Sequence, residues 1–174
     1  LAVTTSEGAL APGESARRVA ALLRGFYHEG IPVGAGRDSG VEAPAWRRCS
    51  ERVDWGEMTT DASPMSAGDA IDRALTLEEE PVVVVALGAL TNWADLLGQR
   101  PDLARRIARI VWYDDHTPGG GANYRADTLS ARRVLASDIP VEILSADPAA
   151  PQAVTPALLD SVAGVGTAYA RKIV

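Results

Sequence analysis

The run at residues 81–88, PVVVVALG, constrains the fold of this chain more than any other feature. Four consecutive valines between a proline and a glycine favour a strand that is buried on both faces, as in a parallel sheet. Similar short apolar runs alternate with amphipathic helical patterns along the chain. This order predicts an α/β fold, with a mostly parallel Rossmann-like sheet and helices on both faces. One sheet is expected to contain the strands at residues 2–5, 82–87, 110–113 and 141–144.

The 174 residues are expected to form a single domain with one sizeable core, since 47% of them are hydrophobic. Helices are predicted at residues 13–30, with Gly30 as the stop signal, and at 66–79, with Ser66 as the cap. Further helices are predicted at residues 90–99 (capped by Thr91), 101–108, 127–137 and 155–174 (Thr155 as N-cap). Residues 37–64 are polar and rich in Trp and Arg, so we interpret them as an irregular insertion or loop.

Charge and composition exclude several classes of protein. The net charge is −6 and there is no basic block, so binding to nucleic acid or to an anionic membrane is disfavoured. A single cysteine, Cys49, allows neither an intrachain disulfide nor a zinc cluster. The longest apolar run is too short to span a bilayer, and there is no signal peptide, so a soluble, cytoplasmic protein is expected. Because a strand stands at the very start, these residues are expected to begin inside a domain.

Residues 110–127, IVWYDDHTPGGGANYRAD, carry the most distinctive polar cluster. They follow a predicted strand directly, and ligands in such folds lie outside the carboxyl ends of the strands. Asp114, Asp115 and His116 are adjacent and point in different directions, which disfavours a shared metal ion. The glycines lack the Lys and Ser/Thr of a phosphate-binding loop. We interpret the run as a flexible rim where the backbone approaches a ligand closely.

The stretch at residues 158–173, LLDSVAGVGTAYARKI, allows two interpretations. It resembles a helix-hairpin-helix element, which binds the DNA backbone through main-chain amides. The acidic balance of the chain and the absence of a cation in the hairpin itself favour the second interpretation, a kinked helix on the flank of the sheet.

Several segments, in the right order, resemble the inosine/uridine-preferring nucleoside hydrolases. The strongest is VVVVALGALTNWADLLGQRPDLARRIARIVWY at residues 82–113, which is similar to a strand, a Gly-x-Leu-Thr-Asn turn, a helix and the next strand of that family. Residues 122–144 resemble its Phe-Asn stretch and the following helix and strand. Residues 154–174 resemble its Leu-Thr-Pro segment, and residues 1–8 its second strand. Only residues 37–64 lie outside the resemblance.

The resemblance implies cleavage of the N-glycosidic bond of a small nucleoside or other riboside by a calcium-bound water, in a homo-oligomer. It implies that the main-chain carbonyl of Leu87 is a calcium ligand and that Asn123 is the family's asparagine. The candidate substrate-binding residues are Asn123, Asn92, Asp114 and Asp115, expected in one cleft at the carboxyl edge of the sheet. No catalytic residue is assigned.

Much of the machinery that the resemblance implies falls outside residues 1–174. The family's aspartates lie on a strand upstream of Leu1, and its His-Asp pair lies downstream of Val174. A family asparagine falls on Ala9, a ribose-contacting glutamate falls on Gly121, and a Gly-Gly pair is replaced by Asp114 and Asp115. Two main hypotheses follow, a calcium-dependent ribohydrolase or a non-catalytic ligand-binding or scaffolding relative; an unrelated doubly wound domain is the third. In either main case, the 174-residue chain alone is expected not to hydrolyse nucleosides.

Overall fold

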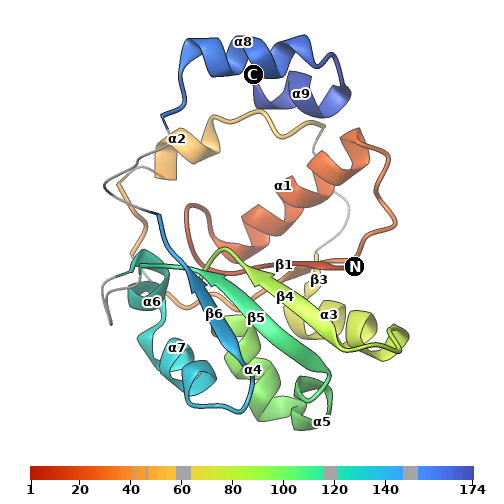
Figure 1. The fold of residues 1–174 in the computed structure, drawn as a ribbon, viewed down its shortest axis with the longest axis vertical. Coiled ribbons are helices and arrows are strands. Elements are labelled where there is room, and N and C mark those ends of the chain that lie inside the picture. The colour runs from red at the N-terminus through yellow and green to blue at the C-terminus, as the bar shows by residue number, and fades with distance from the viewer. Residues whose placement is uncertain (41, 46, 58–63, 116–120, 147–152) are drawn as a thin grey trace.

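The fold consists of two parallel three-stranded sheets with helices packed around them (Figure 1). A computed structural model of the chain describes residues 1–40, 42–45, 47–57, 64–115, 121–146 and 153–174. The first sheet has the order β1-β2-β3, with β1 at Val3–Thr5, β2 at Val33–Ala35 and β3 at Met65–Ser66. The second has the order β4-β5-β6, with β4 at Val82–Ala86, β5 at Ile107–Tyr113 and β6 at Val141–Leu144.

The predicted α/β class and the parallel pairing of β4 with β5 are confirmed. The prediction of a single sheet is wrong, because β1 is bonded to β2 and belongs to a different sheet from β4. Apolar runs predict strands, but they do not record which edges meet. A groove separates β1 from β4, and it carries the candidate site described below.

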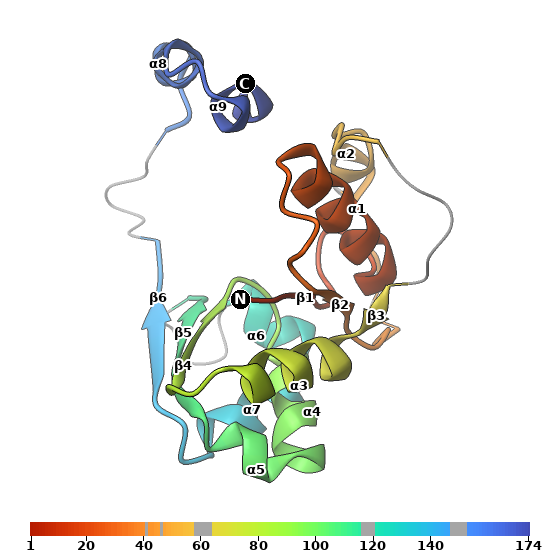
Figure 2. The same cartoon turned by 90° about the vertical axis from the view of Figure 1, so that its right-hand side faces the viewer.

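Helices cover both faces of the first sheet but only one face of the second, as far as the structure describes them (Figure 2). α1 (Pro12–Gly25) and α3 (Ala67–Leu77) lie on opposite sides of β1 and β2. α4 (Thr91–Gln99), α5 (Pro101–Ala104) and α7 (Thr128–Leu135) lie beside the second sheet. On the other face of that sheet, Val83, Val85 and Leu87 are 44%, 67% and 74% exposed.

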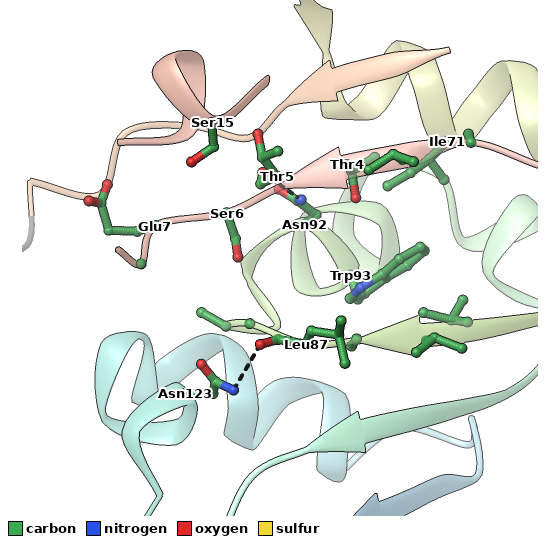
Figure 3. Close-up of a pocket in the computed structure, with 18 of the residues that line it drawn as sticks. Thr4, Thr5, Ser6, Glu7, Ser15, Ile71, Leu87, Asn92, Trp93 and Asn123 are labelled. Atoms are coloured by element: carbon green, nitrogen blue, oxygen red, sulfur yellow. Dashed lines mark hydrogen bonds between the residues drawn. The ribbon is translucent and has the colours of Figure 1, made fainter. Parts of the chain in front are cut away.

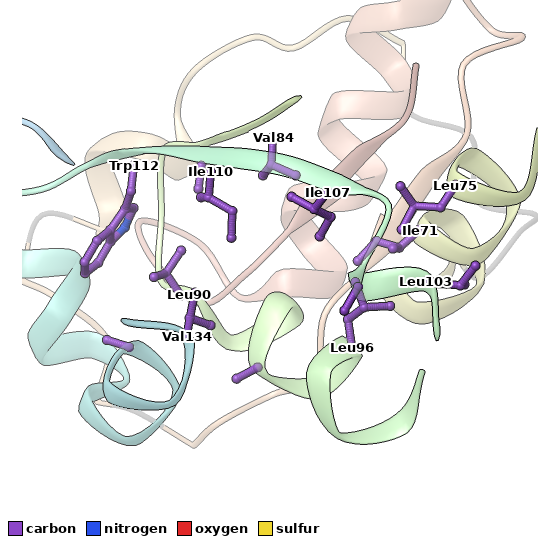
Figure 4. Close-up of a cluster of buried hydrophobic side chains, with 14 residues drawn as sticks. Ile71, Leu75, Val84, Leu90, Leu96, Leu103, Ile107, Ile110, Trp112 and Val134 are labelled. Atoms are coloured by element: carbon purple, nitrogen blue, oxygen red, sulfur yellow. The ribbon is translucent and has the colours of Figure 1, made fainter. Parts of the chain in front are cut away.

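The main hydrophobic core fills the space between the second sheet and its helices (Figure 4). Leu90, Ile110 and Val134 are fully buried there. Trp112 is 1% exposed, and its indole N–H donates to the carbonyl of Gly88 at 3.0 Å, so the largest core side chain also holds the turn after β4. The strand residues that face this core alternate with exposed ones, because successive side chains of a strand point to opposite faces.

Two of the predicted helix caps are confirmed. The hydroxyl of Ser66 accepts the N–H of Asp69 at 3.0 Å, and that of Thr155 accepts the N–H of Leu158 at 3.2 Å. The cap predicted for Thr91 is wrong, because its hydroxyl instead donates to Asp127 at 2.8 Å.

Two helix boundaries differ from the sequence prediction. α1 ends at Gly25, well before Gly30, since Tyr27 turns the chain with a φ of 60°. The predicted C-terminal helix is two helices, α8 (Pro156–Gly164) and α9 (Ala168–Ile173). Gly166 lies between them with a φ of 71°, a left-handed conformation that glycine adopts without strain. A single kinked helix is therefore the wrong description.

Part of the predicted insertion at residues 37–64 is anchored on α1. The stretch contains the short helix α2 (Arg47–Glu51), and β3 begins directly after residue 64. The guanidinium of Arg18 donates to the carbonyls of Glu51 at 3.2 Å and Val53 at 3.3 Å, which satisfies acceptors at the end of α2. No helix in the described ranges has both the length and the apolar character needed to cross a bilayer.

Candidate functional site

The candidate site lies at the carboxyl end of the groove between β1 and β4 (Figure 3). The groove has a volume of about 1190 Å³ and follows both strands along their length. The helix side of the groove is apolar and includes Ile71, Leu75 and Trp93. Polar side chains gather at its carboxyl end, namely Ser6, Glu7, Asn92 and Asn123. The topology brings them together because the carboxyl ends of parallel strands meet at one edge.

Asn123 bridges the ends of two neighbouring strands. It lies in α6 (Ala122–Ala126), a helix that the sequence did not predict. Its side-chain amide donates to the carbonyl of Tyr113 at 2.7 Å and to that of Leu87 at 3.2 Å. These two bonds fix the orientation of the side chain, and Figure 3 shows its amide oxygen on the side of Ser6. Leu87 and Asn123 thus lie side by side, as the resemblance implied.

Asn92 links the two sheets. It lies in the first turn of α4, is 6% exposed, and donates to the main-chain carbonyl of Thr5 at 3.0 Å. Gly36 packs next to this hydrogen bond, since a Cβ there would lie 2.6 Å from the same carbonyl oxygen. Because glycine has no side chain, the loop after β2 can pass close to the Thr5 carbonyl. Asn92 lines the same groove as Leu87 and Asn123.

Asp114 faces α6. Its side chain is buried and accepts the N–H of Tyr124 at 2.9 Å, while its own N–H donates to the carbonyl of Leu144 at 3.0 Å. A side chain at Gly121 would overlap the Asp114 carboxylate, so the two positions share one space. The carboxylate therefore does for α6 what an N-cap side chain would do. Asp115 is exposed after β5, and His116 lies outside the described residues.

A carboxylate that the sequence analysis did not single out lies at the same edge. Glu7 follows Ser6 in the turn after β1, is 6% exposed, and accepts from Arg47 of α2 at 2.8 Å. Arg47 also donates to the carbonyls of Ala9 at 3.1 Å and Gly8 at 3.3 Å. This clamp holds the turn after β1. An acid in the turn after a strand was the available signal, but its partner Arg47 is 40 positions away in the unassigned stretch.

Asp127 holds α4 against α7 behind the site. It caps α7 by accepting the N–H of Ser130 at 3.0 Å, and it accepts the hydroxyl of Thr91 at 2.8 Å and the guanidinium of Arg37 at 3.3 Å. Burial raises the pKa of Asp127, but the hydrogen bonds from Ser130 and Thr91 and the charge of Arg37 outweigh it. The pKa of this carboxyl is therefore lowered from its ordinary value.

The described residues at this edge do not form a calcium site by themselves. Among the residues that the structure describes, no three His, Cys, Asp or Glu side chains come together as a metal site would need. Calcium takes six to eight oxygen ligands, usually including carboxylates. The carbonyl of Leu87 is one suitable oxygen, but Glu7 is paired with Arg47 and Asp114 caps α6.

Comparison with known proteins identifies the family. The family model described as inosine-uridine preferring nucleoside hydrolase matches residues 1–174. This chain belongs to that family. The pyrimidine-specific ribonucleoside hydrolase RihA of Escherichia coli (strain SMS-3-5 / SECEC) is 29% identical over 168 residues, which cover 84% of this chain and 51% of RihA. The chain thus spans about half the length of the curated relatives that it matches.

Solved structures of similar fold include a purine-preferring ribonucleoside hydrolase from Gardnerella vaginalis. Its TM-score is 0.72 at 19% identity, over 98% of this chain and 59% of that one. The type III effector XopQ, solved with adenosine diphosphate ribose, has a TM-score of 0.69 at 17% identity, over 99% of this chain and 54% of its own. At these identities the likeness shows the fold alone, and the mixed α/β architecture agrees with it.

Proposed function

We propose that the whole protein is a nucleoside N-ribohydrolase that cleaves the N-glycosidic bond of a ribonucleoside. One observation carries the proposal: Asn123 is held across the carbonyls of Leu87 and Tyr113 at the polar end of the groove, in a chain of the nucleoside hydrolase family. This edge is where the fold presents ligands.

The chemistry of the edge suits a sugar. Because both N–H groups of the Asn123 amide are directed at main-chain carbonyls, its oxygen is the atom left to accept from a ribose hydroxyl. The hydroxyl of Ser6 lies across the groove from it (Figure 3). As a glycosidic bond breaks, the sugar becomes cation-like, and oxygens around it stabilise that charge. We assign substrate contacts to Asn123 and Asn92, and keep Asp114 and Asp115 as predicted contacts. The Asp114 side chain, which caps α6, would have to turn toward the ligand.

Calcium is the metal that we propose for the whole protein. When bound, such an ion lowers the pKa of a water molecule and orients the ribose. Residues 1–174 would give it the carbonyl of Leu87, and the carboxylates would come from sequence outside these residues. We therefore expect the isolated 174-residue chain to be inactive. A homo-oligomer and a cytoplasmic location are part of the same proposal, tested by light scattering and by cell fractionation.

Hydrolysis assays test the proposal. The protein from its natural gene and the 174-residue chain are incubated with inosine, uridine and a p-nitrophenyl riboside, with calcium or with a chelator. We expect chelator-sensitive turnover by the natural protein alone. Asn123→Ala should abolish most of it, and Gln99→Ala, at an exposed helix end, should leave it unchanged.

Two results would contradict the proposal. Failure of the natural protein to hydrolyse any riboside would remove the catalytic assignment. Chelator-sensitive turnover by the 174-residue chain, lost in Asp115→Ala, would instead mean a relocated metal site at the end of β5.

A non-catalytic riboside-binding relative is the second candidate. Ala9 and Gly121, which carry no polar side chain, favour it because they stand where the resemblance places an asparagine and a glutamate. Calorimetric binding of adenosine diphosphate ribose by the natural protein, without any turnover, would support this candidate over the first.

A further inference from the structure

A second cavity lies away from the groove, where the end of α1 meets α9, and we call it the α1–α9 pocket. Its volume is about 220 Å³. The end of α1 lines it with Leu22, Gly25 and Phe26, and α9 lines it with Arg171 and Lys172. None of the described residues that line the groove between β1 and β4 also lines this pocket, so the two cavities are separate.

The charge of the α1–α9 pocket is opposite to that of the whole chain. Of the described residues that line the pocket, two are cations and none is an acid, whereas the chain has a net charge of −6. Arg171 donates to the carbonyl of Gly166 at 2.8 Å, which holds its guanidinium and leaves further N–H groups for another acceptor. Lys172 lies 3.7 Å from the carboxylate of Asp54, but that side chain is 89% exposed, so the ion pair is weak. The pocket therefore favours an anion.

The remaining walls of the pocket are mainly apolar and aromatic. Leu22 and Phe26 lie on one side, and Trp55, from the stretch after α2, lies on another. The indole N–H of Trp55 is buried and has no hydrogen-bond partner among the described residues. Because buried polar groups are nearly always hydrogen-bonded, this N–H lacks an acceptor, and a small rotation of the indole would present it to a ligand in the pocket. Such walls suit the faces and edges of an aromatic ring.

We propose that the α1–α9 pocket binds a small aromatic carboxylate, a single six-membered ring that carries one carboxylate group. The ring packs against Phe26 and Trp55, and the carboxylate accepts from Arg171. A planar guanidinium can pair with both oxygens of a carboxylate, which makes Arg171 the principal contact, with Lys172 as the second.

The size of the pocket limits the ligand to one ring. Sites for drug-sized ligands have volumes of roughly 300–1,000 Å³, and the α1–α9 pocket is smaller than these. A nucleoside, with a base and a sugar, is therefore too large for it. The proposal does not depend on nucleoside hydrolysis, which is assigned to the groove.

Calorimetric titration of the protein from its natural gene tests the inference. The probes are benzoate and benzamide, which have nearly the same shape but differ in charge. We expect benzoate to bind with a Kd of about 1 mM, a binding free energy within reach of so small a ligand. Benzamide should bind at least tenfold more weakly, because it carries no charge for Arg171 and Lys172. Equal affinities of the two probes would overturn the proposal, as would no binding of benzoate at ten times the expected Kd.

Variants of the two cations show whether the charge lies in this pocket. Arg171→Gln should weaken benzoate binding at least tenfold, and Lys172→Gln should weaken it by a smaller factor. Arg105→Gln makes the same change of charge at an exposed residue outside the pocket lining, so it should leave the Kd unchanged. The same Kd in all three variants would contradict the assignment.

A variant that keeps both cations tests the cavity itself. A Cβ at Gly25 would meet no atom within 4 Å, so Gly25→Leu can be accommodated and adds a side chain to the pocket lining. Benzoate binding should be lost in Gly25→Leu and kept in Gly13→Leu, at the start of the same helix, where a Cβ also meets nothing. Asn123→Ala, in the groove, should not change benzoate binding. Binding that survives in Gly25→Leu, or that is lost in Asn123→Ala, would place the probe elsewhere and overturn the proposal.

Discussion

Replacement of Asp127 by alanine should loosen the layer of helices behind the candidate site. The carboxylate is 13% exposed and has three partners, the N–H of Ser130, the hydroxyl of Thr91 and the guanidinium of Arg37. Alanine leaves the start of α7 without a cap and the buried Thr91 hydroxyl without its acceptor. Both losses act on the folded state.

The size of the effect follows from these contacts. Loss of a helix cap costs about 1 kcal/mol, and a hydrogen bond to a charged acceptor contributes roughly 1.5 kcal/mol. Arg37 is half exposed, so its ion pair adds little. We expect Asp127→Ala to lower the free energy of unfolding by about 2–3 kcal/mol. For a chain of this size, Tm should fall by about 5–10 °C.

Urea denaturation, with thermal melting in parallel, measures the change. Asp127→Asn keeps a capping oxygen and should cost less than Asp127→Ala. In a double-mutant cycle with Thr91→Val, the two losses should fall short of additivity by at least about 0.5 kcal/mol, because the variants remove one shared bond. A loss below about 0.5 kcal/mol for Asp127→Ala, or strict additivity with Thr91→Val, would refute the reasoning.

The same carboxylate sets a pH dependence. Since the pKa of Asp127 is lowered in the folded protein, its stabilisation is fully present above the ordinary aspartate pKa of about 3.9 and is lost as the pH falls through the folded-state value. The difference in stability between the unsubstituted protein and Asp127→Asn should therefore be constant from about pH 5 to 8 and shrink below about pH 4. A difference that grows on acidification would show the opposite sign.

Two further substitutions probe close approaches and the link between the sheets. Gly34→Ala would place a Cβ 2.7 Å from that of Ala70, so the free energy of unfolding should fall by about 1–3 kcal/mol. The control Gly68→Ala has no close neighbour and should not destabilise the protein. Equal effects of the two variants would contradict this packing. Asn92→Asp removes the donor to the Thr5 carbonyl, so the free energy of unfolding should fall by about 1–3 kcal/mol at pH 7. The fall should be smaller at pH 3, where the protonated carboxyl can donate. A fall that does not depend on pH would argue against that hydrogen bond.

Local patterns in the sequence predicted the elements better than their assembly. The four valines of β4 predicted a parallel strand, which is confirmed, although burial on both faces is not, since Val83 and Val85 are exposed. The spacing from Ser66 to Asp69 predicted the start of α3. Both signals lie within a few residues. The separation of β1 and β4 into two sheets was not predicted, because local patterns do not show which strands pair across the chain. Thr91 shows the same limit, since its hydroxyl prefers Asp127, 36 positions away.

The candidate site was predictable only where it depends on the order of the strands. The order of the strands predicts that Leu87 and Asn123 meet at one edge, and they do. The position of the Asp114 side chain was not readable, because it depends on the helix α6 and on the space left by Gly121. Its role as a substrate contact stays a prediction. The clamp of Arg47 on Glu7 arises within a stretch that had no recognisable pattern.

The pair of C-terminal helices has a consequence for how the molecule opens. Within the described residues, α8 has no buried side chain and α9 has only Ala170. Tyr169 of α9 has its ring 4.4 Å from that of Phe26 and its hydroxyl 2.7 Å from the His28 ring nitrogen. The ammonium of Lys172 lies 3.7 Å from the Asp54 carboxylate. So little burial makes the two helices a separate cooperative unit with a low free energy of local unfolding. The end of α1 can therefore be uncovered while both sheets stay intact.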